Sequence, residues 1–404
     1  MRPSILFLCT APPLGNSGAG VRTRQIAKTL HSLGQVTIVG ISNRPWSKEQ
    51  IAQAKAEFDV ARTITYQPWP HVGFSGRVRQ VLDPQYLNSN AVQVAPSDRE
   101  FVDDLIRQRD VTWIHTLKIA NSFQRLHWNR SVMDVDDIPS RYHTLAAAQA
   151  ATVGAKLKRW RNAFAEKRRE RLCLDRFDVL TVCKESDREH FDNDPRVHVV
   201  PNGFATPESV APRSIVPGQP RLGMIGHFEH LPNLDGLKWF ASEVWPHVRS
   251  KVPSAELRLV GKGSDSLSQK LNVPQIKGLG FVHDVAQEMA TWSGMIVPTR
   301  LGGGTHLKVA EGLARRVPIV MTPHGARGYD VSHGCEALIA ESSSEFAIAC
   351  QRILLDPALG NRLAEAGWRL FNTRYSWESI APTIAATVDH CLALNPKLAD
   401  AALS

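Results

Sequence analysis

Two series of short apolar segments, separated by a stretch rich in Pro, Ser and Gly, constrain the fold of this chain most strongly. Apolar helical stripes alternate with these segments, and short apolar runs of this kind are typical of parallel strands buried on both faces. The pattern predicts two doubly wound, Rossmann-like α/β domains. The expected strands are 5–9, 36–39, 111–115, 132–134 and 179–182 in the first series and 222–225, 257–260, 295–298 and 319–321 in the second.

The expected domain boundaries follow from length and composition. A chain of 404 residues exceeds the ~100–200 residues of an ordinary domain, so two domains are expected. Residues 206–220 lack helical or strand periodicity, and we interpret them as a linker. The first domain then spans 1–205 and the second 221–376. The last helical stretch, within 377–404, leaves open whether it packs on the second domain or back on the first.

The composition favours a protein of the cytoplasm. Hydrophobic residues make up 43% of the chain and charged residues 22%, which is the balance of a globular protein. No run of about 18 apolar residues indicates a membrane-spanning helix. The six cysteines are scattered without metal-ligand spacing, and we expect them to be reduced core thiols.

Much of the net charge of +9 lies between residues 156 and 171. This stretch holds eight Lys or Arg and two Glu, a surplus of six positive charges. Leu157, Trp160, Phe164 and Leu172 recur at helical spacing within it, which indicates a basic amphipathic helix. Two interpretations are open: a core helix with a solvated outer face, or a helix that lies on anionic lipid headgroups at the inner face of the cell membrane. No nucleic-acid partner is expected.

A Gly-rich loop follows the first expected strand. It spans residues 15–20 and opens a helix, so the free backbone N–H groups of Gly18, Ala19 and Gly20 suit a phosphate or a sugar hydroxyl. The loop does not match the Gly-x-Gly-x-x-Gly fingerprint of dinucleotide-binding proteins. A tight structural turn is the alternative interpretation.

The segment 298–314 carries the strongest signal for chemistry. Three consecutive glycines, 302–304, follow an expected strand and allow a ligand to approach the backbone closely. The next helix presents its N-terminus to an anion, which predicts a diphosphate site. Lys308 would add a positive charge there, and Glu311 would accept hydrogen bonds from a ribose diol. The alternatives are a solvated charge for Lys308 and a capping or helix-packing role for Glu311.

Several segments, taken in order, resemble the retaining glycosyltransferases of family 4. They are 15–33, 200–203, 224–228 with 232–233, 257–261, 278–282 and 303–311 with 318–322. The resemblance implies the GT-B fold, in which two Rossmann-like domains face each other across a cleft. It also implies that the second domain binds a nucleotide-diphosphate sugar and that the first binds the acceptor, a cell-surface glycan or a lipid-linked glycan.

The same resemblance implies site residues. Residues 18–20 are similar to a loop that meets the donor's phosphate or sugar. His115 is similar to a histidine that contacts the sugar, with a buried structural histidine as the alternative, so His115, Lys308 and Glu311 are the expected catalytic residues. The other expected donor-binding residues are His227, Asn233, Gly261, Lys262, Phe281, Val282, Gly303, Gly304, Thr305, His306 and Leu307, of which Phe281 and Val282 would hold the base.

The sequence departs from the family at two places. Gly303 stands where the family has the first acid of its paired-glutamate motif, and Glu311 matches the second. The usual Arg and Lys after the first strand of the second domain are not in place, because His227 and Asn233 occupy that neighbourhood. Lys308 is expected to replace the missing cation.

An acidic cluster that includes Asp136 and Asp137 ends a first-domain strand. Clustered carboxylates suit hard cations. GT-B enzymes generally need no metal, however, so the resemblance assigns both residues to acceptor hydroxyls, with a surface turn as the alternative. No metal is expected, and no cofactor besides the nucleotide-sugar co-substrate.

These features together predict a retaining, metal-independent hexosyltransferase that moves a sugar onto an acceptor hydroxyl. Two other functions are open. A nucleotide-sugar 2-epimerase shares the fold and would need no acceptor. A catalytically silent nucleotide-sugar-binding protein is motivated by Gly303.

Overall fold

The computed structural model describes residues 2–14, 18–68, 73–83, 85, 92–148, 150, 152–215, 218–302 and 304–394. The chain forms two compact units: Met1–Pro201 with Ile380–Ser404 make unit 1, and Asn202–Ser379 make unit 2. Residues 206–220, interpreted above as a linker, belong with unit 2. Helix α17 (Trp377–Leu394) begins in unit 2 and continues into unit 1.

A parallel sheet forms the centre of unit 1. Its seven described strands lie in the order β3-β2-β1-β6-β7-β8-β9. The five strands expected from the apolar pattern are confirmed, and β3 and β9 are additional. Both lie at sheet edges, where β3 buries only Val60 and Ile64 and β9 is short, so neither shows a long apolar run. The strands are β1 (Ser4–Cys9), β2 (Gln35–Ser42), β3 (Asp59–Thr65), β6 (Val111–His115), β7 (Trp128–Asp136), β8 (Phe177–Val182) and β9 (Val197–Val199).

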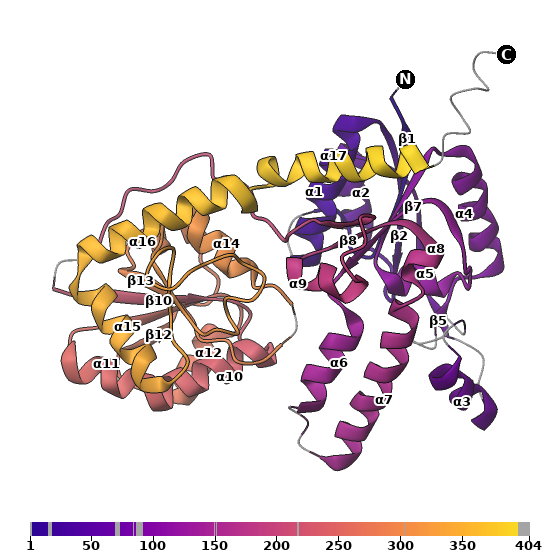
Figure 1. Cartoon of the computed structure of the whole chain (residues 1–404). Coiled ribbons are helices and arrows are strands. Elements are labelled where there is room, and N and C mark those ends of the chain that lie inside the picture. Colours follow the sequence, from indigo (N-terminus) through magenta and orange to yellow (C-terminus); the bar gives the residue numbers. More distant parts are fainter. Residues whose placement is uncertain are drawn as a thin grey trace. The chain divides into compact units, whose positions relative to one another are not determined.

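Helices cover both faces of this sheet, because successive residues of β1 from Ile5 to Leu8 are all fully buried. In Figure 1, α6 and α7 form a hairpin that extends away from the sheet, and α3 lies beside α7. The helices are α1 (Gly18–Leu33), α2 (Lys48–Glu57), α3 (Phe74–Leu82), α4 (Pro96–Gln108), α5 (Leu117–Ser122), α6 (Pro139–Ala148), α7 (Val153–Glu170), α8 (Cys173–Arg176) and α9 (Glu185–Arg188). A short antiparallel pair, β4 (Gln67–Pro68) and β5 (Val92–Gln93), completes the unit's regular elements together with a 3-10 turn, Glu189–Phe191.

Unit 2 is built on a second parallel sheet. Its six described strands lie in the order β12-β11-β10-β13-β14-β15, and all four expected strands are confirmed. The strands are β10 (Arg221–Ile225), β11 (Glu256–Val260), β12 (Ile276–Gly278), β13 (Gly294–Val297), β14 (Ile319–Met321) and β15 (Leu338–Ile339). The helices are α10 (Leu231–Trp239), α11 (Trp245–Lys251), α12 (Ser264–Leu271), α13 (Val285–Ala290), α14 (Leu307–Ala314), α15 (Ser343–Leu355) and α16 (Pro357–Leu370), with π turns at Phe240–Val244 and Phe371–Tyr375.

The core of unit 2 is built around aromatic side chains. The Phe346 ring of α15 packs edge to face on Trp239 and on Phe240, with ring centroids 5.5 and 5.9 Å apart. All three rings are buried in one cluster with the sheet residues Leu222 and Leu257. Aromatic pairs in this geometry stabilise a core beyond the burial of their area, so they fix α10 and α15 on the sheet.

Strand order determines where each unit can bind a ligand. In unit 1 the chain runs from β1 outwards to β2 and β3, then returns to β6 on the other side of β1. In unit 2 it runs from β10 to β11 and β12, then returns to β13 beside β10. In open parallel sheets, ligands bind beyond the carboxyl ends of the strands at such a reversal. The loops after β1, β6, β10 and β13 are therefore the places to examine.

Two local expectations are corrected. The Gly-rich loop was expected to extend to Gly20, but α1 already begins at Gly18, because the N–H groups of a helix's first turn make no i→i−4 bond and a Gly-rich segment can form that turn. The cysteines were expected to be core thiols; five are buried, and Cys335 is exposed on a turn. No helix among the described residues is long and apolar enough to cross a membrane.

Candidate functional site

The loops after β10 and β11 of unit 2 approach each other closely. Gly226 follows β10 and Gly261 follows β11, and a Cβ atom at Gly261 would lie 2.1 Å from the carbonyl oxygen of Gly226. A Cβ atom at Gly226 would in turn lie 2.8 Å from the side-chain nitrogen of Asn233. Glycine is therefore required at both positions, and the predicted donor residue Gly261 acts through backbone packing.

Asn233 joins this loop to the Gly-rich segment after β13. Its side chain is buried, and its Nδ2 donates to the carbonyl oxygen of His227 at 2.9 Å. Its Oδ1 accepts a hydrogen bond from Lys308 Nζ at 2.6 Å. The structure therefore brings together the predicted residues His227, Asn233 and Lys308 at the carboxyl end of the sheet.

Lys308 lies in the first turn of α14 and is partly buried. Burial lowers the pKa of Lys308 to about 8. In the part of the chain that the structure describes, no carboxylate forms an ion pair with it, and its hydrogen-bond partner Asn233 is neutral. A desolvated cation at a helix N-terminus, where backbone N–H groups also lack helical partners, is a site for an anion.

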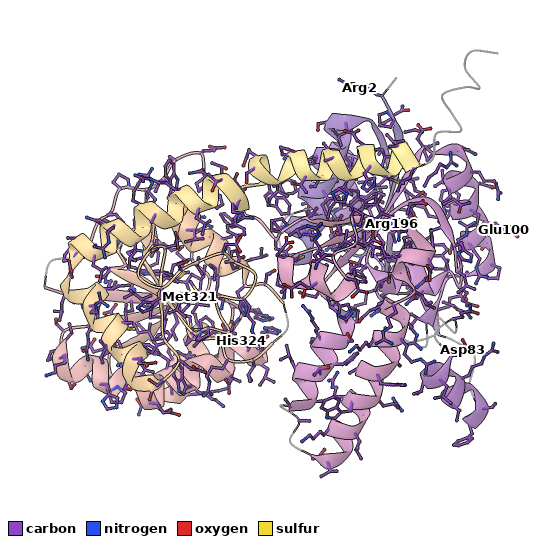
Figure 2. All side chains as sticks on the ribbon, viewed as in Figure 1. Arg2, Asp83, Glu100, Arg196, Met321 and His324 are labelled. Atoms are coloured by element: carbon purple, nitrogen blue, oxygen red, sulfur yellow. The ribbon has the colours of Figure 1, made fainter. Side chains whose placement is uncertain are left out.

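The rest of the Gly-rich segment is fixed from within unit 2. Asn202 Nδ2 donates to Thr305 Oγ1 at 2.7 Å, which ties the start of the unit to the loop before α14. The ring of His306 lies 6.1 Å from that of His324, and Figure 2 shows His324 shortly after Met321, the last residue of β14. Gly304 and Leu307 flank these residues in sequence, and Gly303 lies outside the described residues.

Glu311 is already paired in the structure. Its Oε1 accepts from Arg315 Nε at 3.1 Å, one helical turn away. Burial raises the pKa of Glu311, and the Arg315 charge opposes that rise. Glu311 and Lys308 lie one turn apart on α14. The pair with Arg315 is an i,i+4 contact and not the inter-helix contact expected as the alternative, and the binding of ribose hydroxyls stays a prediction.

Other predicted donor residues lie at the exposed rim. Phe281 is 84% exposed after β12, with Val282 partly buried behind it, which suits a ring that stacks on a base. His227 Nε2 and Lys262 Nζ lie 3.0 and 3.2 Å from the same carboxylate oxygen of Glu229. Glu229 thus neutralises part of the positive charge on this side, which distinguishes exposed Lys262 from Lys308.

Asp134 organises the predicted site of unit 1. Its carboxylate accepts from Arg22 Nη2 at 2.6 Å and from Thr181 Oγ1 at 2.8 Å, and it lies 3.0 Å from His115 Nδ1. Burial opposes ionisation of Asp134, but the Arg22 charge and the His115 hydrogen bond outweigh it and hold the pKa of Asp134 well below its ordinary value. His115 is only 2% exposed, so this buried network fixes the position of its ring.

Sequence reasoning gave no site role to Arg22 or Asn202, and it included Asp134 in the acidic cluster before Asp136 and Asp137 without a role of its own. Arg22 follows the predicted residues 18–20 on α1 by one turn, and it also donates to the carbonyl oxygen of Val200 at 3.1 Å. The signal in the sequence was a charged residue within an otherwise apolar strand, Asp134, and a cation on the buried side of α1. Residues 15–17 lie outside the described residues.

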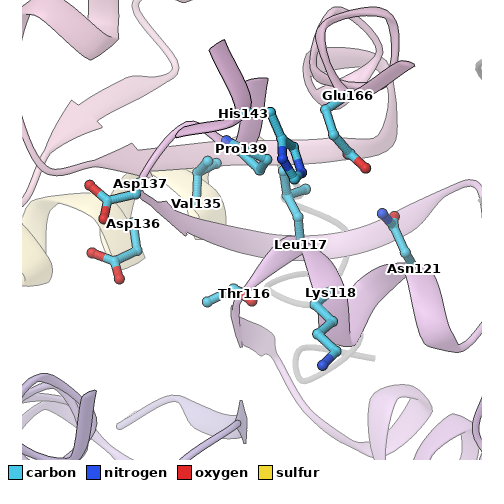
Figure 3. Close-up of a pocket in the computed structure, with 10 residues that line it drawn as sticks. All are labelled: Thr116, Leu117, Lys118, Asn121, Val135, Asp136, Asp137, Pro139, His143 and Glu166. Atoms are coloured by element: carbon cyan, nitrogen blue, oxygen red, sulfur yellow. The ribbon is translucent and has the colours of Figure 1, made fainter. Parts of the chain in front are cut away.

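A pocket of about 230 Å³ lies at the carboxyl ends of β6 and β7 in unit 1. Figure 3 shows Asp136 and Asp137 together at one side and His143 and Glu166 at the other. Asp136 has a left-handed backbone (φ 59°), which turns the chain out of β7. Burial and then the neighbouring Asp136 charge raise the pKa of Asp137 to about 6. The two predicted acceptor residues are therefore brought to one pocket.

No group of three or more His, Cys, Asp or Glu residues arranged to hold a metal ion occurs among the described residues.

Comparison with known proteins gives one family and several structures. Residues 219–356 match the family of Glycosyl transferases group 1. No curated protein sequence matches the chain significantly. Sucrose-phosphate synthase from Thermosynechococcus elongatus is similar in structure, with a TM-score of 0.67 at 16% identity over 98% of this chain and 100% of that one.

Two further structures agree. HepE of Anabaena, solved with UDP, has a TM-score of 0.64 at 16% identity over 96% of this chain and 99% of its own. WaaG, a glycosyltransferase involved in lipopolysaccharide biosynthesis, has a TM-score of 0.58 at 14% identity over 95% and 99%. This protein therefore has the GT-B fold, and residues 219–356, most of unit 2, match the family of Glycosyl transferases group 1.

Proposed function

We propose that this protein transfers a sugar from a nucleotide-diphosphate sugar to an acceptor hydroxyl, with retention of configuration and without a metal ion. Unit 2 binds the donor and unit 1 binds the acceptor. The observation that carries the proposal is Lys308, a partly buried cation at the N-terminus of α14 whose described hydrogen-bond partner is the neutral Asn233 side chain.

The electrostatics of Lys308 favour a diphosphate over a neutral ligand. Taking an ammonium out of water costs free energy that a neutral amide does not restore, and an anionic ligand restores it. The positive end of the α14 helix dipole favours the same anion. As charge develops on the departing diphosphate, these groups stabilise it more strongly than they stabilise the bound substrate.

The proposed reaction needs no strong protein base. The bond from the sugar's anomeric carbon to the diphosphate breaks, and the acceptor oxygen bonds to that carbon on the same face. The acceptor's proton passes to the departing diphosphate. His115, held by Asp134, contacts the sugar, and Glu311 receives hydrogen bonds from the ribose. Asp136 and Asp137 bind acceptor hydroxyls in the unit 1 pocket.

The similar structures support the choice of ligand. HepE has been solved with UDP, with UDP and glucose, and with UDP-glucose. TarM of S. aureus has been solved with UDP and a GlcNAc-glycerol compound. A nucleotide-diphosphate sugar is the ligand class that these relatives share with the proposed reaction. We propose that the acceptor is a glycan or a lipid-linked glycan, used at the cytoplasmic side.

Two rival functions make different predictions. A nucleotide-sugar 2-epimerase would convert the donor when no acceptor is present. A silent binding protein, which Gly303 motivates, would bind the donor and leave it intact with every acceptor. Incubation with donor alone, followed by donor with acceptors, distinguishes the three functions.

The first test is thermal unfolding of the protein with UDP, GDP, ADP and dTDP, and with their common sugar conjugates. A ligand present at 100 times its dissociation constant adds about 2.7 kcal/mol to the free energy of unfolding. We expect stabilisation by one diphosphate series and none by the matching nucleosides. No stabilisation by any nucleotide would contradict the proposal.

A further inference from the structure

Helix α7 presents an apolar stripe to solvent. The side chains of Val153, Leu157, Trp160 and Phe164 are 75%, 65%, 50% and 52% exposed. At about 100° per residue they fall within one sector of about 60° on the helix surface. A core helix buries its apolar stripe. The interpretation of this stretch as a core helix with a solvated charged face is therefore wrong.

Positive charges flank the stripe on both sides. Helical spacing places Lys156 and Lys167 along one border and Arg161 and Arg168 along the other. We call these four cations and the four apolar side chains the α7 outer face. The face thus combines exposed apolar groups with a border of cations.

The acids of α7 are turned away from the α7 outer face. Glu170 is buried and accepts from the backbone nitrogen of Ser140 on α6 at 2.7 Å. Glu166 pairs with the buried Arg169 at 3.1 Å. Because both carboxylates are satisfied on the inner side of the hairpin, they do not neutralise the cations outside. The α7 outer face therefore carries a net positive charge.

Helix α3 adds a second exposed apolar stripe next to α7. Phe74, Val78 and Leu82 are 85%, 40% and 56% exposed, at helical spacings that put them on one face. Contacts between α3 and α7 hold the two helices side by side (Figure 1). Exposed apolar side chains scattered singly are ordinary, but two contacting helices that each expose an apolar stripe indicate an interaction site.

The chemistry of this patch favours a lipid surface over a protein groove. A helix that lies in the plane of a membrane buries apolar side chains such as Trp and Phe at the acyl boundary, and its bordering Lys and Arg contact anionic headgroups. The patch on α7 and α3 has this composition. We propose that α3 and the α7 outer face dock unit 1 on an anionic bilayer, with the apolar stripes at the acyl boundary and the four cations at the headgroup phosphates. The inference goes beyond sugar transfer and does not depend on it.

The test is co-flotation of the full chain with vesicles made of equal parts phosphatidylcholine and phosphatidylglycerol, compared with vesicles of phosphatidylcholine alone. We expect binding to the anionic vesicles, weakened by salt, and much weaker binding to the neutral ones. The charge variant Lys156→Gln/Arg161→Gln/Lys167→Gln/Arg168→Gln should weaken binding roughly 100-fold or more, since each cation near an anionic surface contributes about fivefold.

The apolar variant Leu157→Ser/Trp160→Ser/Phe164→Ser should weaken binding at least about tenfold. All three side chains are exposed, so folding is expected to be kept, and thermal unfolding checks it. The matched controls are Lys48→Gln/Lys55→Gln on α2 and Ile348→Ser/Leu355→Ser on α15, which change exposed residues elsewhere and should leave binding intact.

Three outcomes would overturn the proposal. One is equal binding to neutral and anionic vesicles, and another is binding that neither variant weakens. The third is absence of vesicle binding by the full chain; if the chain is then also an oligomer that the apolar variant dissociates, the patch covers a second copy of the protein instead.

Discussion

Arg22 of unit 1 and Lys308 of unit 2 occupy similar positions and have opposite surroundings. Each lies in the early turns of a helix that follows a central strand, Arg22 after β1 and Lys308 after β13. Arg22 is fully buried and makes a two-bond contact with the carboxylate of Asp134, at 2.6 and 3.1 Å. Lys308 has the neutral Asn233 as its described partner.

This difference separates a cation that builds the fold from one that we propose binds an anionic ligand. The Arg22 charge is compensated within unit 1, so it stabilises the site's framework whether or not a ligand is bound. The Lys308 charge is desolvated, and no described residue supplies a counter-charge, so the arrangement is costly until an anion binds. Loss of Arg22 should therefore lower the stability of the ligand-free protein, whereas loss of Lys308 should weaken anion binding.

The largest effect is expected from Arg22→Met. The substitution leaves the buried Asp134 carboxylate without its counter-charge and should lower the free energy of unfolding by about 3–5 kcal/mol. The matched control is Arg24→Met on the same helix, which breaks an exposed pair with Glu57 and should cost less than about 1 kcal/mol. Chemical denaturation measures both, and equal losses would contradict the structural role of Arg22.

A smaller effect is expected when Lys308→Met is unfolded without ligand. The variant loses a hydrogen bond to Asn233 but also removes a poorly solvated charge, so its free energy of unfolding should fall by no more than about 1 kcal/mol. The same denaturation experiment measures it. A loss as large as that of Arg22→Met would show that Lys308 supports the fold.

The pH dependence of stability sharpens the contrast. The pKa of Lys308 is about 8 in the folded chain against an ordinary value of 10.5. Between these values the unfolded state binds more protons, so the free energy of unfolding should rise with pH across this window. Lys308→Met should remove that rise, whereas the exposed control Lys262→Met should keep it. Parallel pH profiles for wild type and Lys308→Met would refute the shift.

The smallest effect concerns Asp137 of the unit 1 pocket. Its pKa is raised from 3.8 to about 6, with Asp136, Lys184, Asp187 and Arg22 as the charges that act on it. The folded state therefore binds more protons in this window, and stability should fall as the pH rises through it.

Asp137→Asn should remove that fall, an effect of about 1 kcal/mol once solvent screening is allowed for. Denaturation at several pH values compares it with the exposed control Asp104→Asn. A control that flattens the profile as much as Asp137→Asn would assign the fall to other groups.

The sequence was most informative where strands are buried on both faces. The strands ending at Cys9, His115, Ile225 and Val297 were all predicted, because a fully buried strand requires an apolar run. Since ligand-binding loops follow such strands, the segments around Lys308 and Asp137 were predicted with them. Edge strands such as β3 were not predicted, because their exposed residues interrupt the apolar run.

Contacts between distant parts of the chain had no local signal. Lys308 and Asn233 are 75 positions apart, and Arg22 and Asp134 are 112 apart. Helical periodicity identified the apolar stripe of α7, but the same period describes a buried stripe and an exposed one. The stripe is exposed because α6 packs against the other side of α7, and this packing has no signal in the local sequence.

The most direct test of the account is a calorimetric comparison of a nucleoside diphosphate with its parent nucleoside, on wild type and on Lys308→Met. The base should be the one that stabilises the protein in the thermal panel. We predict that wild type binds the diphosphate much more tightly than the nucleoside, and that Lys308→Met reduces the ratio of the two affinities by about tenfold or more. An unchanged ratio, or no binding of either ligand to wild type, would contradict it.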